Sequence, residues 1–423
     1  MSTTCVRDAT RDVTNGALVR GTTQRTSPAA AGWLFLLVSL VITFLAGSSA
    51  PTPLYATYQR ELGFSLVMTT VIFGVYALAV LASLLTVGRL SDHVGRRPVM
   101  LSATVVQVLV MLLFADAHGI GGLLAGRVLQ GLATGAAVGA VGSAMLDISP
   151  RLGPIANAAA PGAGTGIGAI SSGLIVGYLP APTHTIYLAL AAALVLQLVV
   201  LTRLPETSPR LPGAVGSLRP GISVPPSARA AVLAAAPVLF AVWALAGFFG
   251  ALAPSLLTTL SGSASVVHDG LGFFLLAGTA SVATLLLGGT APRTVLVIGI
   301  AAFALGVGGA MVSVLAHSAV AFLGSAVIAG VGFGSGFQGA LRSVLAVTPA
   351  ADRSGVLSSI YVVSYLGFGA PAVLAGWLVV RGLPLVDVAV GYTVFLLLLA
   401  AGTALALHPW SAEDVIEAAG AAS

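Results

Sequence analysis

Between residues 88 and 98 the sequence reads Gly88-Arg89-Leu90-Ser91-Asp92-His93-Val94-Gly95-Arg96-Arg97-Pro98, a charged stretch between two long apolar runs. Gly88 and Gly95 permit a tight reversal of the chain, because glycine adopts backbone conformations that other residues avoid. The carboxylate of Asp92 suits the exposed N–H groups at the start of a neighbouring helix. The stretch is therefore predicted to form a short loop at a membrane face.

The composition on both sides of this loop is typical of a membrane protein. Of the 423 residues, 57% are hydrophobic and 7% are charged, whereas a soluble domain carries about 25% charged residues. A helix needs about 20 apolar residues to cross a bilayer. Such runs lie at 31–50, 66–87, 98–115, 121–145, 154–178, 184–203, 230–254, 268–288, 294–315, 319–341, 355–380 and 386–407. The sequence therefore predicts an all-α integral membrane protein with twelve transmembrane helices.

The chain divides near its middle into two related halves. The stretch 204–229 is rich in Pro and Arg and is predicted to be a solvated cytoplasmic linker. It separates an N-terminal six-helix bundle, 31–203, from a C-terminal one, 230–408, with cytoplasmic tails at 1–30 and 409–423. A shift of 199 residues matches Gly131 with Gly330, Gly135 with Gly334, and Pro150 with Pro349. Duplicated bundles are typical of secondary transporters, whose binding site lies between the repeats.

The arginines predict the orientation of the chain. With both termini in the cytoplasm, all 18 arginines face that side except Arg60 and Arg381 at the outer face and Arg127 inside a span. This is the positive-inside pattern of membrane proteins, and it accounts for the net charge of +5 without a nucleic-acid partner. The single cysteine, Cys5, excludes a disulfide or a thiolate metal site within one chain.

The segment 88–97 resembles the signature loop of the major facilitator superfamily, G-x-L-x-D-x-x-G-R-[KR], at every signature position. The resemblance covers the spans, the linker and the paired halves, and it implies a transporter of the bacterial inner membrane that needs no cofactor. It also implies a conformational latch, whose members would be Gly88, Asp92, Gly95, Arg96 and Asp147. In that latch Asp92 contacts the start of span eleven, near Ser354 and Gly355. The alternative is that the arginines only anchor the topology.

Arg127 is the one charged residue predicted well inside a span. With Gln130 it resembles the family's R-x-x-[QG]-G pattern in span four. An arginine at bilayer depth costs about 3 kcal/mol, so it has to face protein or water. The 199-residue shift places Arg127 and Gln130 on Ala326 and Ala329, so the fold does not require the charge. We expect a functional Arg127, either a substrate ligand or a partner in proton coupling, with a structural role as the alternative.

Other polar and aromatic side chains are expected to line the cavity between the bundles. These substrate or coupling candidates are Gln107, Gln338, Tyr55, Tyr76, Trp243, Tyr361 and Tyr365. Aromatic residues near span ends often serve only as interfacial anchors. The prolines at 51 and 53 are predicted to break the end of span one and to provide a hinge or gate.

These features predict a monomeric transporter that exports small amphiphilic or drug-like molecules or metabolites by alternating access, with protons as a candidate coupling ion. Span five, 162–173, resembles the family's antiporter motif only in part, and close helix packing is the alternative interpretation. Uptake or facilitated diffusion of a small polar solute is the second functional hypothesis, and a non-transporting receptor on the same fold is the third. An enzyme is not expected, because the spans lack clusters of His, acid or nucleophile residues.

Overall fold

The computed structural model describes residues 28–88, 90–208, 211–219, 223–262, 266–349 and 352–407. The predicted tails, apart from 28–30, and Arg89 lie outside these ranges. The helices are α1 (Pro28–Ser49), α2 (Pro51–Leu62), α3 (Leu66–Thr86), α4 (Ser91–Val94), α5 (Arg96–Ala115), α6 (Ile120–Ile148), α7 (Gly153–Tyr178), α8 (Pro182–Leu201), α9 (Ala214–Ser217), α10 (Pro226–Ala251), α11 (Ala253–Ser261), α12 (Val266–Leu286), α13 (Pro292–Leu315), α14 (Ala319–Ala346), α15 (Arg353–Val380) and α16 (Leu385–Leu407).

These helices confirm the predicted all-α membrane fold. Within the described ranges, eleven helices are long and apolar enough to cross a bilayer, and α12 contributes a shorter apolar stretch, Gly270–Leu286, as the twelfth. The predicted spans coincide with the helices to within a few residues at each end. A helical span pairs its own backbone groups, as a hydrocarbon solvent requires.

The predicted break at the end of span one is only a local interruption. Helix α1 ends at Ser49 and α2 begins at Pro51, while Ala50 between them keeps right-handed helical dihedral angles. Because Ala50 stays helical, Pro51 continues the helix, but its missing N–H leaves the carbonyl four residues earlier without a helical donor. The chain is interrupted in the same way between α10 and α11, so the two halves repeat this feature as well.

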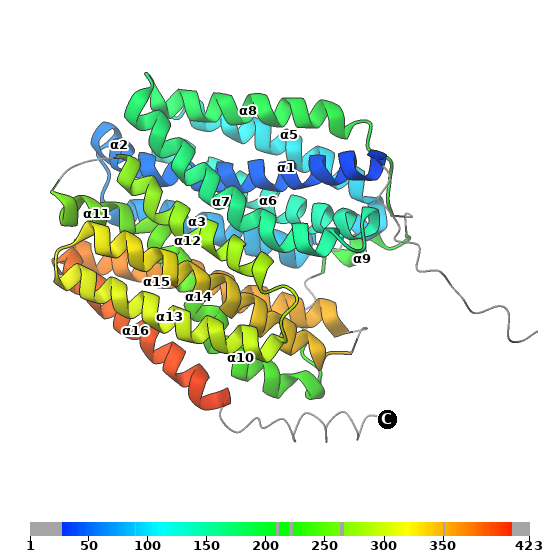
Figure 1. The fold of residues 1–423 in the computed structure, drawn as a ribbon. Coiled ribbons are helices and arrows are strands. Elements are labelled where there is room, and N and C mark those ends of the chain that lie inside the picture. The colour runs from blue at the N-terminus through cyan, green and yellow to red at the C-terminus, as the bar shows by residue number, and fades with distance from the viewer. Residues whose placement is uncertain are drawn as a thin grey trace, which may run out of the picture.

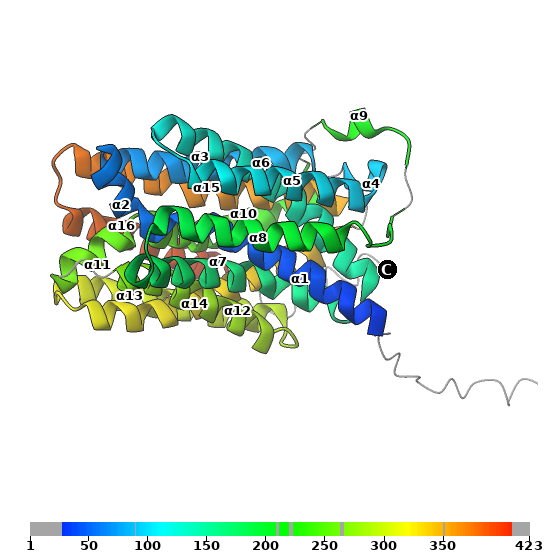
Figure 2. The same ribbon diagram turned by 90° about the horizontal axis from the view of Figure 1, so that it is seen from above.

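The helices run side by side and α1 begins at the end of the molecule where α16 finishes (Figure 1). That end also carries α4 and α9, while α2 and α11 lie at the opposite end in both views (Figure 2). Helices α1, α3, α5, α6, α7 and α8 pack into one bundle, and α10 to α16 into the other. The main contacts between bundles join α7 to α12 and α3 to α15.

Glycines on α7 let this helix approach two neighbours closely. Gly164 and Gly168 lie against Ile42 and Ala46 of α1, where an added methyl group would overlap the carbonyl oxygens of those two residues. Gly162 faces α12, where an added methyl group would clash with the Ser281 hydroxyl and lie 3.0 Å from the Ala277 carbonyl oxygen. Small residues four apart share one face of a helix and permit such backbone contacts in membranes. Close packing therefore accounts for the glycine pattern of span five.

Equivalent glycines, Gly131 and Gly330, allow close helix packing in both bundles. A methyl group on Gly131 of α6 would lie 2.7 Å from the Tyr76 carbonyl oxygen of α3. A methyl group on Gly330 of α14 would clash in the same way with the Leu276 carbonyl oxygen of α12. The second and fourth spans thus cross at equivalent glycines in each half. Together, the sequence repeat and these glycine contacts show that the fold consists of two pseudo-symmetric halves.

Candidate functional site

Arg127 is buried in the N-terminal bundle and holds three helices together. Its side chain lies on α6 and is 1% exposed. Nη1 donates to the Ser48 carbonyl oxygen of α1 at 2.9 Å and to Gln130 Oε1 at 2.6 Å. Nη2 donates to the hydroxyl of Tyr55 on α2 at 2.6 Å. The guanidinium therefore sits where α1 passes into α2.

The interruption of α1 explains the position of Gln130. Pro51 has no N–H, so the carbonyl of Gly47, four residues earlier, lacks its helical donor. Gln130 Nε2 donates to that carbonyl at 3.0 Å. In the second half the interruption lies at Leu252, and the residue that follows it, Ala253, keeps its N–H. This difference explains why Ala329 suffices where the first half has Gln130.

The charge of Arg127 is surrounded by aromatic faces. Its Cζ lies 5.3 Å from the ring centre of Tyr76 and 5.9 Å from those of Tyr55 and Phe114. The described residues bring no carboxylate into ion-pair distance of it, and Nε has no hydrogen-bond partner among them. A buried cation that only dipoles and rings neutralise retains the capacity to attract an anionic or strongly polar group.

Trp243 is the centre of an aromatic cluster in the C-terminal bundle. Its ring on α10 lies 4.9 Å from Tyr365 and 5.6 Å from Phe368, both on α15, measured between ring centroids. Phe333 and Phe337 of α14 contact the same ring edge-on at 6.2 and 5.8 Å. The indole Nε1 is buried without a hydrogen-bond acceptor among the described residues. The cluster thus offers flat apolar surfaces and one unused N–H donor.

The arginine network and the aromatic cluster meet across the boundary between the bundles. Phe73 of α3 lies 4.6 Å from Phe368 between ring centroids, at a tilt of 44°, and Phe368 belongs to the Trp243 cluster. Tyr76, whose ring faces Arg127, lies about one helical turn after Phe73 on α3 and so shares its face. Tyr361 lies about one turn before Tyr365 on α15. One continuous set of side chains therefore runs from Arg127 to Trp243 through both halves.

Two predicted cavity residues lie inside single bundles rather than at the boundary between them. Gln107 of α5 is fully buried inside the N-terminal bundle beside Gly47, and its amide has no partner among the described residues. Gln338 of α14 donates to the Thr284 carbonyl oxygen of α12 at 3.2 Å, so it joins two helices of its own bundle. The sequence alone does not show whether a glutamine in a predicted span faces the cavity between the bundles or a neighbouring helix of its own bundle.

The charged loop forms an ion-pair group at the α4–α5 turn. Arg96 Nε lies 2.8 Å from Asp147 Oδ2 at the end of α6, and Arg96 Nη2 lies 3.9 Å from Asp92 Oδ1. The start of α15 lies against the linker instead, because Gly355 packs on Ser223. A methyl group on Gly88 would clash with the carbonyl oxygen four residues earlier in the chain. The structure thus contains an ion pair between Arg96 and Asp147, while a contact between Asp92 and the start of α15 stays a prediction.

Glu206 is a residue of this loop region that the sequence interpretation missed. The start of the linker is docked on the loop, with Leu204 fully buried, while most of the described linker residues are exposed. The Glu206 carboxylate accepts from the backbone N–H groups of Arg96 at 2.8 Å and Arg97 at 3.2 Å. These are orphan donors at the start of α5, and a carboxylate there also meets the positive end of the helix dipole. Gly95 has φ +99°, a conformation that residues with a side chain rarely adopt, and a methyl group there would also displace the Glu206 carboxylate, whose Oε2 would lie 2.5 Å away.

Replacing Glu206 by alanine is expected to lower the stability of the cytoplasmic end. Loss of a helix-capping side chain costs about 0.5–2 kcal/mol. Thermal unfolding of the purified full-length protein in detergent should show a lower midpoint for Glu206→Ala than for the wild type. Glu61→Ala is the matched control, because Glu61 is an exposed acid near the end of α2, on the opposite side of the membrane fold. Equal midpoints for the two variants would contradict a capping role.

Comparisons with known proteins agree with this architecture. The family model of the Major Facilitator Superfamily matches residues 36–292, more than half of the chain. The chain belongs to the major facilitator superfamily. It is therefore a multi-pass membrane transporter, since the superfamily consists of transporters and not of enzymes.

Several solved superfamily structures share the fold. The nucleoside transporter NupG, solved as a point mutant, aligns with a TM-score of 0.69 at 12% identity, covering 88% of this chain and 99% of that one. A bacterial homologue of the human lysosomal transporter Spinster, inward-facing and unoccupied, gives 0.69 at 13% identity, with 92% and 100% covered. The human organic anion transporter MFSD10 gives 0.65 at 18% identity, with 89% and 100% covered. At these identities the likeness concerns the fold.

A curated relative is similar over a shorter stretch. The multidrug resistance protein MdtL of Klebsiella pneumoniae (strain 342) is 33% identical over 103 residues. That stretch is 24% of this chain and 26% of MdtL, so this chain spans about a quarter of the length of the relative that it matches.

Proposed function

We propose that this chain exports small amphiphilic or drug-like molecules or metabolites across the bacterial plasma membrane by alternating access. The observation that carries the proposal is the continuous set from Arg127 to Trp243, which spans both bundles through the contact of Phe73 with Phe368. A ligand seated there would contact both halves at once. Binding could then bias the rocking of one bundle against the other, because a ligand shifts a conformational equilibrium only through different contacts in the two states.

The chemistry of the set favours neutral or anionic substrates. Arg127 supplies the only charge, Trp243 supplies a free N–H donor, and the aromatic rings supply apolar surface. Binding pockets for small molecules combine apolar walls with few polar groups in the same way. Export is supported by the partial similarity to MdtL, which is a multidrug resistance protein. We place both termini in the cytoplasm, because the end of the molecule where α1 begins also carries α4 and α9 and faces that side under the positive-inside rule.

Facilitated diffusion or uptake is the second candidate function. It is favoured by the lack of any carboxylate in ion-pair distance of Arg127 within the described residues. Carboxylates inside membrane spans are the usual proton relays of pumps and transporters. A proton-coupled mechanism therefore needs an acid at a helix end, for which Asp147 and Glu61 are the candidates.

Flux measurements on purified protein in liposomes test the proposal and separate the two functions. Neutral, anionic and cationic amphiphilic dyes would be loaded, and their movement followed with and without an imposed pH gradient. Export predicts protein-dependent flux of neutral or anionic dyes, and acceleration by the gradient indicates proton coupling. Flux that only follows the dye gradient indicates a facilitator, and no flux of any dye or small polar solute would contradict a transporter of these substrates.

Trp243→Ala is expected to weaken substrate binding more than it slows translocation. The variant removes one face of the aromatic cluster, and aromatic pairs are worth about 0.5–1.5 kcal/mol beyond burial of their area. The half-saturating dye concentration should rise by about tenfold, while Trp243→Phe should lie between the variant and the wild type. Trp377→Ala is the control, because Trp377 is 45% exposed on the outer part of α15. Unchanged saturation in Trp243→Ala would place the substrate elsewhere.

A further inference from the structure

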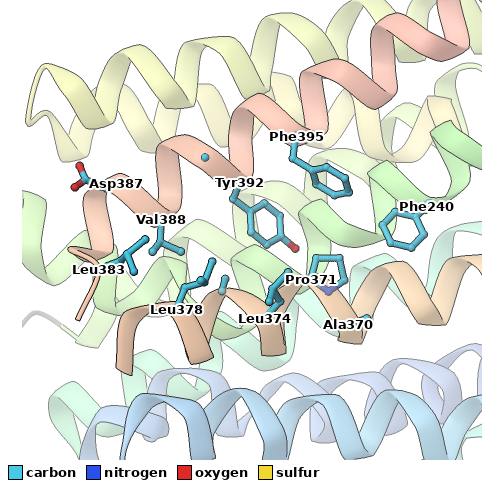
Figure 3. Close-up of a pocket in the computed structure, with 12 residues that line it drawn as sticks. Phe240, Ala370, Pro371, Leu374, Leu378, Leu383, Asp387, Val388, Tyr392 and Phe395 are labelled. Carbon is cyan, nitrogen blue, oxygen red and sulfur yellow. The ribbon is translucent and has the colours of Figure 1, made fainter. Parts of the chain in front are cut away.

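A groove of about 540 Å³ lies between α15 and α16, away from the set that joins Arg127 to Trp243. Figure 3 shows its walls on α15 and α16, with Phe240 of α10 at the deep end. The residues that define its ends and walls are Phe240, Pro371, Leu374, Asp387, Gly391 and Phe395. Its volume lies within the range of about 300–1,000 Å³ that is typical of small-molecule sites.

Small residues open the groove, and α10 keeps it in shape. Ala370, Pro371 and Ala375 form the α15 wall, and an added methyl group on Gly391 of α16 would meet nothing within 4 Å. Tyr392 donates its hydroxyl to the Ala244 carbonyl oxygen of α10 at 2.8 Å. Phe395 contacts the ring of Phe240 edge-on, at 6.2 Å between ring centroids. The groove is therefore built from fixed walls rather than from loosely packed side chains.

The groove opens towards the lipid and extends through most of one leaflet. The lining side chains Leu374, Leu383 and Phe395 are 56, 43 and 40% exposed. From Asp387 to Phe395 the helix rises about 12 Å at 1.5 Å per residue. Half of the hydrocarbon core of a bilayer is about 15 Å thick. A molecule with its head at the outer interface and one chain reaching towards the bilayer midplane matches this shape.

Asp387 gives the mouth of the groove a negative charge. It is the only charged residue that lines the groove, and the described residues provide no ion-pair partner for it. The nearby Arg381 stacks on Trp377, with its Cζ 4.8 Å from the ring centre. The first turn of α16 stabilises the carboxylate through the helix dipole. The position of Asp387 at the mouth of the groove therefore complements a cationic head.

We propose that this groove binds a single-chain amphiphilic cation of the alkylammonium class from the outer leaflet. The alkyl chain lies along Leu374, Gly391 and Phe395, and the ammonium group lies at Asp387. Amphiphiles with an anionic head are excluded by the same carboxylate. The site does not depend on the proposed transport function, because it lies on the lipid side of α15 and α16.

Equilibrium binding of radiolabelled decyltrimethylammonium to the full-length protein in phosphatidylcholine nanodiscs tests this site. Binding to empty nanodiscs is subtracted. We expect saturable binding of one ligand per chain that decyl sulfate and decanol do not displace. Gly391→Phe fills the groove and should weaken binding by at least about tenfold, and Asp387→Asn should remove the preference for the cation. Gly402→Phe is the matched control, because Gly402 lies on the same helix, also meets open space and does not line the groove.

The outcomes that would overturn the site are distinct. Binding to Gly391→Phe with wild-type affinity would place the cation elsewhere on the protein. Equal loss in Gly391→Phe and Gly402→Phe would indicate a general effect on α16. Competition by decanol as strong as by the unlabelled cation would mean that lipid chains alone fill the groove. Thermal unfolding midpoints of the variants show that each is folded, and Asp387→Asn tests the charge without changing the volume of the side chain.

Discussion

Arg127→Ala is expected to reduce dye flux in liposomes by at least about tenfold. The variant loses hydrogen bonds to Ser48, Gln130 and Tyr55, and a bond to a charged group contributes about 1.5–3 kcal/mol. It also removes the only positive charge of the set that joins Arg127 to Trp243. Initial rates over a range of dye concentrations, at equal amounts of inserted protein, provide the measurement.

Arg127→Lys separates the charge from the geometry. Lysine keeps the positive charge but lacks the planar fork that donates to the α1 carbonyl, Gln130 and Tyr55 together. We expect partial flux with an altered preference among neutral and anionic dyes. Arg151→Ala is the control, because Arg151 is exposed just before the start of α7. Wild-type flux in Arg127→Ala, together with a lowered unfolding midpoint, would mean that the arginine only joins α1, α2 and α6.

Exchange of charges between Arg96 and Asp147 is expected to have the second large effect. Each single variant, Arg96→Asp or Asp147→Arg, places two like charges where the structure has a 2.8 Å ion pair. Arg96 is 13% exposed, so the pair is partly shielded from water and lies between the surface case of about 1 kcal/mol and the buried case of about 3–5 kcal/mol. Flux should fall by about tenfold in each single variant and recover at least in part in the double variant.

The double variant makes this test specific for the pair. Residues in contact show coupling energies of about 0.5–3 kcal/mol in a double-mutant cycle. Both dye flux and the thermal unfolding midpoint should be measured for each variant of the cycle. A latch is expected to affect flux more than the unfolding midpoint. Arg151→Asp controls for the loss of one cytoplasmic positive charge. Additive effects of the two charge changes would show that Arg96 and Asp147 act independently.

Much of the fold follows from the sequence because a bilayer imposes strong rules. A run of about 20 apolar residues has few alternatives to a spanning helix, and the predicted spans coincide with the helices. The signature loop at 88–97 and the matched glycines Gly131 and Gly330 point to the family and to the two halves. Arg127 could be found as well, because a charge inside an apolar run is costly and therefore conspicuous.

The partners of these residues could not be predicted in the same way. Glu206 reaches the start of α5 from more than one hundred residues away in the chain, and the composition of the linker gave no sign of that contact. The sequence also left the neighbours of Arg127 open, whereas the structure surrounds it with the rings of Tyr55, Tyr76 and Phe114. Tertiary contacts between distant polar groups leave no periodic signal in a single sequence.

The glycine faces of α7 also determine which kind of movement the bundles can make. Interdigitated side chains resist sliding, because each one has to leave its hole before it can enter the next. Gly270 of α12 lies backbone on backbone against Ala169 and Gly173, and at Gly162 only the short Ser281 side chain intervenes, so few such steps exist. The boundary between α7 and α12 is thus suited to shear, in which two packed helices shift along each other by small amounts. A bulky residue at Gly162 would hinder the sliding of α7 along α12 while leaving the interior of each bundle unchanged.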